Sequence, residues 1–134
     1  MSEDLTHFFE PAEAEAILPE LDRLLAEAQA LLTRLEEARR RLSEPARANG
    51  HVILNDSSAV APSNETQSIQ AQLEGILQRI QSQGVIVRDI PMGLIDFPAV
   101  RDEQVIFLCW RRGEALRIDW WHPPSTGIAG RRRL

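Results

Sequence analysis

The sequence predicts an α+β fold, in which a long antiparallel two-helix hairpin packs on a small antiparallel β-sheet of three to four strands. Two segments carry apolar residues at alternating steps of three and four, which is the spacing of a coiled-coil seam. After Gly84 the pattern changes to that of short strands. The chain has 134 residues, enough for one hydrophobic core, so we expect residues 1–134 to form a single domain.

The first helix is predicted over residues 11–43. Its seam consists of Ile17, Leu21, Leu24, Ala28, Leu31, Leu35, Ala38 and Leu42. A second apolar line through Leu18, Leu25 and Leu32 widens the apolar stripe, so this helix is expected to contact more than one neighbour. Pro19 lacks the N–H group of an internal helical hydrogen bond. We therefore expect a kink there, or a separate short helix before the long one.

The second helix is predicted over residues 64–83. It begins with a possible capping box, Asn64-Glu65-Thr66-Gln67, and its seam consists of Ile69, Leu73, Ile76 and Ile80. Two successive seams predict a hairpin, joined by an irregular connector at residues 46–62. The seams could be buried on each other, on the sheet or on a second copy of the chain, and periodicity leaves all three open.

The sheet is predicted over residues 84–122, with a tail at 123–134. Strands are expected at 85–88, 94–97, 105–110 and 116–121, and the last two would form a hairpin through a turn at 111–114. An even loop places Trp110 opposite Ala115, and an odd loop places it opposite Leu116. In the even register the side facing the helices would hold Val105, Phe107, Cys109, Leu116, Ile118 and Trp120. The other side would be a covered or binding surface that holds Ile106, Leu108, Trp110 and Trp121 around Arg117 and Asp119.

Five ordered blocks in the C-terminal half carry a family resemblance. They are Gly93-Leu94-Ile95-Asp96-Phe97-Pro98, Leu108-Cys109-Trp110, Gly113-Glu114, Trp121-His122, and Gly127 with Gly130-Arg131. In these blocks the chain resembles DUF2203, an uncharacterised bacterial family of domains of unknown function. The chain departs from the family pattern at Pro123-Pro124, at Ile128 and in its triple Arg end. The resemblance implies a shared fold but transfers no catalytic residues.

Composition restricts the classes of partner. The formal net charge of −5 argues against broad affinity for nucleic acid. The chain has neither a signal-peptide start nor an apolar run of about 20 residues that could span a bilayer, so we expect a cytoplasmic protein without a membrane partner. Cys109 is the only cysteine, which excludes an internal disulfide. We expect Cys109 to be a buried, unreactive thiol.

Asp96 and His122 are the side chains most suggestive of chemistry. Asp96 lies between Ile95 and Phe97 on an apolar strand, so its carboxylate requires a donor, for which the candidates are Arg88, Arg101, Arg117 and Arg131. We favour a buried structural acid over a general base or a ligand. His122 could be an acid-base group or a metal ligand, but a packed histidine is the commoner case. A metal site would require Asp96, Glu114 and His122 to converge.

Two hypotheses about function follow. We prefer a protein-interaction or assembly module, in which Leu18, Leu25 and Leu32 contact a second copy in a homodimer or a helical protein partner. The alternative is a small-ligand (anion or metal) binding protein, or an enzyme, with its site on the sheet. The candidate ligand-binding residues are Asp96, Trp110, Glu114, Arg117, Trp121, His122 and Arg131. No catalytic residue, metal ligand or cofactor is assigned from the sequence.

Overall fold

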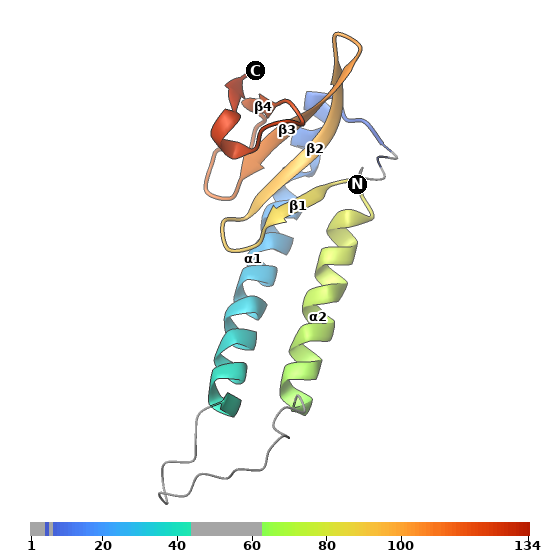
Figure 1. Cartoon of the computed structure of the whole chain (residues 1–134). Helices are drawn as coiled ribbons and strands as arrows, with labels where there is room; N and C mark the ends of the chain where they lie inside the picture. Colours follow the sequence, from blue (N-terminus) through green and yellow to red (C-terminus); the bar gives the residue numbers. More distant parts are fainter. Residues whose placement is uncertain (1–4, 6, 44–62) are drawn as a thin grey trace, which may run out of the picture.

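Two antiparallel helices and a sheet make up the fold (Figure 1). The computed structural model describes residue 5 and residues 7–43 and 63–134. Helix α1 spans Pro11–Ser43 and helix α2 spans Asn64–Gln81. The sheet covers one end of the hairpin, while at the other end the described part of the chain consists of the two helices (Figure 1). The predicted α+β fold is confirmed, and the predicted connector at 46–62 lies outside the described residues.

Helix α1 is continuous through Pro19, so the expectation of a separate short helix is wrong. Pro19 is exposed, whereas its neighbours Leu18 and Leu21 are fully buried. Burial on both sides of the proline stabilises the helix across the one missing backbone hydrogen bond. Among the described residues, no helix is both long enough and apolar enough to cross a membrane.

The start of α2 differs from the predicted capping box by one residue. Ser63 is the N-cap, and its hydroxyl oxygen accepts a hydrogen bond of 3.1 Å from the Thr66 backbone N–H. The Thr66 hydroxyl in turn donates to the Ser63 carbonyl, which allows this polar side chain to be buried.

The two predicted seams form the core between the helices. The buried members are Leu21, Leu24, Ala28, Leu31, Leu35, Ala38, Ile69, Leu73, Ile76 and Ile80. Leu18 and Leu25 are fully buried in the same core, and Leu32 is partly buried against it. The apolar surface of Leu18 and Leu25 is therefore used within the chain. A homodimer or a helical partner stays a prediction.

Five strands form the sheet in the order β1-β2-β3-β4-β5, and each is antiparallel to the next. Their bounds are β1 Ile86–Asp89, β2 Leu94–Arg101, β3 Gln104–Arg111, β4 Trp120–His122 and β5 Arg132–Arg133. The sheet has one strand more than the three to four expected, because the predicted tail contributes β5. A short 3-10 turn at Ile128–Gly130, η3 in the element order, precedes β5.

The side of the sheet that faces the helices is the opposite of the predicted one. The β2–β3 ladder pairs Ile95 with Trp110, Phe97 with Leu108 and Ala99 with Ile106, and all six belong to the core that includes both helices. We call the other side, which holds Asp96 and Cys109, the outer side. The prediction was wrong because β3 is buried on both sides from Ile106 to Trp110, so no polar alternation marks a solvent side.

The last two predicted strands do pair antiparallel, but the turn at 111–114 and both the even and the odd register are wrong. Strand β4 begins only at Trp120 and pairs Cys109 with Trp120 and Phe107 with His122. Residues 112–119 form an irregular connection because other contacts hold them. The Trp110 indole N–H donates to the Ala115 carbonyl over 2.9 Å, and the Ile118 backbone N–H donates to the Glu15 carboxylate on α1 over 3.0 Å.

Candidate functional site

Asp96 is the centre of a buried polar cluster on the outer side of the sheet. It points away from the helices because its neighbours Ile95 and Phe97 fill the core side. Only 1% of its surface is exposed. Its Oδ2 atom accepts a hydrogen bond of 2.8 Å from Arg88 Nε on β1. Among the four arginines considered from the sequence, Arg88 is the partner.

His122 of β4 contacts the same carboxylate oxygen, and its Nε2 lies 2.9 Å from Asp96 Oδ2. Its Nδ1 lies 2.8 Å from the Pro123 carbonyl oxygen. A carbonyl oxygen can only accept, so Nδ1 carries a hydrogen and donates. If the ring were neutral and Asp96 ionised, two lone pairs would face each other across 2.9 Å. A proton shared by the pair, or another cation, must therefore stabilise the contact.

Cys109 completes the cluster from β3. One potential ligand atom from each of Asp96, Cys109 and His122 lies within 4.8 Å of the other two, and all three residues are buried. The pKa of the Cys109 thiol is raised to about 12, mainly by burial and then by the negative charge of Asp96, against the opposing effect of Arg131. The expectation of a buried thiol is confirmed, and its lack of reactivity stays a prediction that the raised pKa favours.

A cavity of about 800 Å³, which we call the outer cavity, opens above this cluster. Its polar lining comes from Arg88, Asp96, His122 and Thr126. The rest is Leu5, Leu94, Val105, Phe107, Pro124, Gly127 and Ile128. Its volume is within the range of small-molecule sites. The Arg88 guanidinium lies over the Phe107 ring at 5.0 Å, so a cation meets an aromatic wall at the floor of the cavity.

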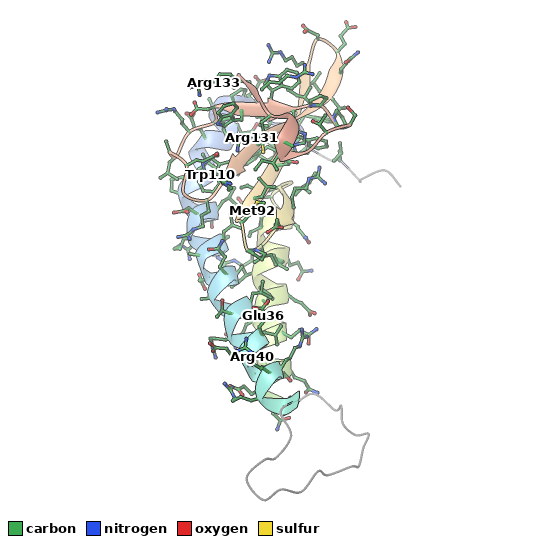
Figure 2. The ribbon with its side chains drawn as sticks, turned by 60° about the vertical axis from the view of Figure 1, so that its left-hand side comes forward. Glu36, Arg40, Met92, Trp110, Arg131 and Arg133 are labelled. Carbon is green, nitrogen blue, oxygen red and sulfur yellow. The ribbon has the colours of Figure 1, made fainter. Side chains whose placement is uncertain are left out.

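A second polar pair, Arg131 with Glu114, lies beside the cluster. Arg131 Nη2 donates to Glu114 Oε2 over 2.7 Å, and the guanidinium stacks over the Trp120 ring at 4.7 Å. Figure 2 shows Arg131 and Arg133 at the sheet end of the molecule, far from Glu36 and Arg40 on the hairpin. Arg133 also lies over Trp120, at 5.0 Å. These contacts give the arginine-rich end of the chain a structural role.

The structure brings together two pairs of the predicted ligand-binding residues, Asp96 with His122 and Glu114 with Arg131. The other three lie elsewhere. Trp110 and Trp121 are on the side of the sheet that faces the helices and do not line the outer cavity, and Arg117 pairs with Asp119 at the surface. Sequence reasoning did not join Cys109 to this set.

Comparison with known proteins gives one family match. A family model described as an uncharacterized conserved protein, DUF2203, matches residues 7–134. No curated protein and no solved structure matches the chain. The match spans both helices and the sheet, so the resemblance seen in the C-terminal blocks extends to nearly the whole chain.

Proposed function

Since the chain belongs to the DUF2203 family, whose description states no activity, we propose from the site itself that the protein binds a small amphiphilic anion in the outer cavity. The observation that carries this proposal is a chain of hydrogen-bonded ionisable side chains, Arg88, Asp96 and His122, which forms the floor of a cavity with mainly apolar walls. Convergent polar groups in an apolar cavity are typical of ligand sites.

The charge of this floor favours an anion. A single proton between Asp96 and His122 would leave the pair neutral whichever of them holds it. Arg88 stays protonated, and the three side chains therefore have a combined charge of +1. The Arg88 side chain is 33% exposed, so its charge can act on a molecule in the cavity.

The walls favour a ligand with an apolar body. Leu94 and Val105 contribute aliphatic surface from β2 and β3, Phe107 contributes a ring, and Ile128 covers them from the C-terminal segment. Burying an apolar body against these walls would be favourable by about 25 cal/mol per Å². A carboxylate or sulfonate on an aromatic or aliphatic body fits both requirements.

We place this proposal before assembly through the helices because two of the three residues predicted to contact a partner are buried within the chain, while the third, Leu32, is partly buried. Leu18 and Leu25 have no exposed area. The outer cavity, in contrast, is lined by the ionisable groups Arg88, Asp96 and His122.

The test uses anilinonaphthalene sulfonate, an aromatic anion whose fluorescence rises in apolar surroundings. A side chain at Gly127 would point into open space on the cavity lining, so Gly127→Leu should fill part of the cavity without a clash. We expect this variant to bind the probe at least about tenfold more weakly, a loss of about 1.4 kcal/mol. Gly75→Leu adds the same side chain at an open position on α2 and should leave the affinity unchanged.

A second pair of variants tests the charge. Arg88→Gln should weaken probe binding, while Arg79→Gln on the exposed surface of α2 should not. Equal affinities for Gly127→Leu and Gly75→Leu, or for the two arginine variants, would contradict binding in the outer cavity.

A further inference from the structure

We propose that Asp96, Cys109 and His122 form a zinc-binding site at the floor of the outer cavity. The three residues offer a carboxylate oxygen, a sulfur and an imidazole nitrogen from three adjacent strands, β2, β3 and β4. This mixed donor set suits zinc, which binds all three ligand types, better than it suits magnesium or calcium, which prefer oxygen. The inference goes beyond the anion site and does not depend on it.

An unpartnered atom at the site points independently to a cation. Asp96 Oδ1 is buried and accepts no hydrogen bond from any residue that the structure describes. A buried carboxylate oxygen without a partner is costly. Arg88 satisfies the other oxygen, Oδ2, and so leaves Oδ1 available to a metal ion.

The orientation of His122 is that of a metal ligand. Its Nδ1–H donates to the Pro123 carbonyl, which fixes the ring and leaves the Nε2 lone pair directed toward Asp96. Ligating histidines commonly donate their other ring N–H to a carbonyl or carboxylate in this way. A zinc ion would supply the positive charge that the contact between Nε2 and Asp96 requires.

The dimensions need only a small adjustment. Bonds of about 2.0–2.3 Å at tetrahedral angles place donor atoms roughly 3.3–3.8 Å apart. The donors here all lie within 4.8 Å of one another, so they must approach by about 1.5 Å at most. Rotation of the three side chains can provide this without a change of strand register.

The surrounding charges permit a cation. Binding would release two protons to solvent, the Cys109 thiol proton and the proton held between Asp96 and His122, so the thiolate and the Asp96 carboxylate together balance the zinc charge. Arg131, the other cation near Cys109, is paired with Glu114. Asp96 and His122 line the outer cavity, so the fourth coordination position would face it. Three protein ligands with a fourth position toward a cavity are typical of zinc sites that bind water or substrate.

The experiment uses Co²⁺ as a spectroscopic probe on the full chain after treatment with a chelator. Tetrahedral cobalt bound to a thiolate gives a charge-transfer band in the near ultraviolet and intense visible bands. Because Cys109 is the only cysteine, such a band reports on this residue alone. We expect the bands to saturate at one equivalent, to disappear when Zn²⁺ is added in competition, and to be accompanied by proton release.

Variants identify the ligands. Cys109→Ser should abolish the charge-transfer band, and His122→Gln and Asp96→Asn should weaken cobalt binding about 10- to 100-fold or more. A double variant, His7→Gln with His51→Gln, removes the other two histidines and should bind cobalt as the unaltered chain does. Circular dichroism checks the fold of each variant. Cys109→Ser is the most conservative replacement, so it remains informative if Asp96→Asn does not fold.

The proposal is overturned if the unaltered chain shows no thiolate band, or if the band persists in His122→Gln with the same affinity. Binding of anilinonaphthalene sulfonate is measured on the same chelated protein. A chain that binds the sulfonate but no cobalt retains the proposed function and loses the zinc site. A chain that binds cobalt through Cys109 but no sulfonate retains the zinc site and loses the proposed function.

Discussion

Cys109 lies directly opposite Asp96 in the ladder between β2 and β3, so the only thiol of the chain has a buried carboxylate as its cross-strand neighbour. Both burial and the negative charge of that carboxylate favour the protonated thiol. Because of these two effects, ionisation of Cys109 links the free energy of unfolding to pH in the alkaline range.

The free energy of unfolding should fall above pH 9. The Cys109 pKa is raised from 9.0 to about 12 in the folded chain, so only the unfolded thiol ionises in this interval. The stabilisation is fully present below pH 9 and is lost as the pH rises toward 12, by about 1.4 kcal/mol at pH 10. Urea unfolding of chelated protein at pH 8, 9 and 10 measures the decrease.

The composition of the chain removes other titrating side chains from this measurement. All 15 basic side chains are Arg and the chain has no Tyr, so Cys109 is the only side chain that titrates between about pH 9 and 11.5. The control Cys109→Ala should show no decrease over the same interval. An equal decrease in both proteins would show that the thiol pKa is not raised on folding.

Gly93→Ala should destabilise the protein by at least about 1–2 kcal/mol. Gly93 has a φ of +65°, and an added Cβ would lie 2.5 Å from the Arg112 Cβ atom, which cannot move without its backbone. Thermal or urea unfolding measures the loss. Gly75→Ala, at an open helical position, should instead stabilise by about 0.5–1 kcal/mol, and a loss of stability there would undermine the comparison.

Ser63→Ala should cost about 1 kcal/mol, because it leaves the Thr66 backbone N–H without its capping oxygen. Ser68→Ala within α2 changes the same atoms at an exposed position and should cost little. Urea midpoints of the two variants provide the comparison. Equal midpoints would mean that Ser63 does not cap the helix in solution.

Leu25→Ala should destabilise by about 2–5 kcal/mol, because the side chain is fully buried within the chain. If the hairpin needs no second copy, the urea midpoints of the unaltered chain and of this variant should not depend on protein concentration. Leu42→Ala removes a side chain that is 54% exposed and should have little effect. Midpoints that rise with concentration would support the homodimer instead.

The helical half of the fold could be predicted from the sequence because its signal repeats. The spacing of Leu21, Leu24 and Leu31, and of Ile69, Leu73 and Ile76, matches one face of a helix, and these residues form the core. The direction in which the sheet faces could not be predicted in the same way. Strand β3 is apolar on both sides from Ile106 to Trp110, so alternation gives no answer.

The turn between β2 and β3 sets the register of these two strands. Asp102 and Glu103 both have positive φ, and they join Arg101 to Gln104 in a two-residue hairpin turn. Counting back from that turn places Asp96 opposite Cys109. The site was therefore only partly predictable: Asp96 and His122 stand out as polar residues in apolar strands, while the role of Cys109 depends on a pairing that no periodicity reveals.

The coverage of only one end of the hairpin by the sheet has a consequence for local unfolding (Figure 1). Figure 2 places Glu36 and Arg40 on the part of α1 that runs beside α2 away from the sheet. Opening the far end exposes less apolar surface, so its amide hydrogens should exchange with solvent sooner than those beside the sheet. We therefore expect the part of α1 beside the sheet to stay closed, and the part farther from the sheet to open at a lower free energy.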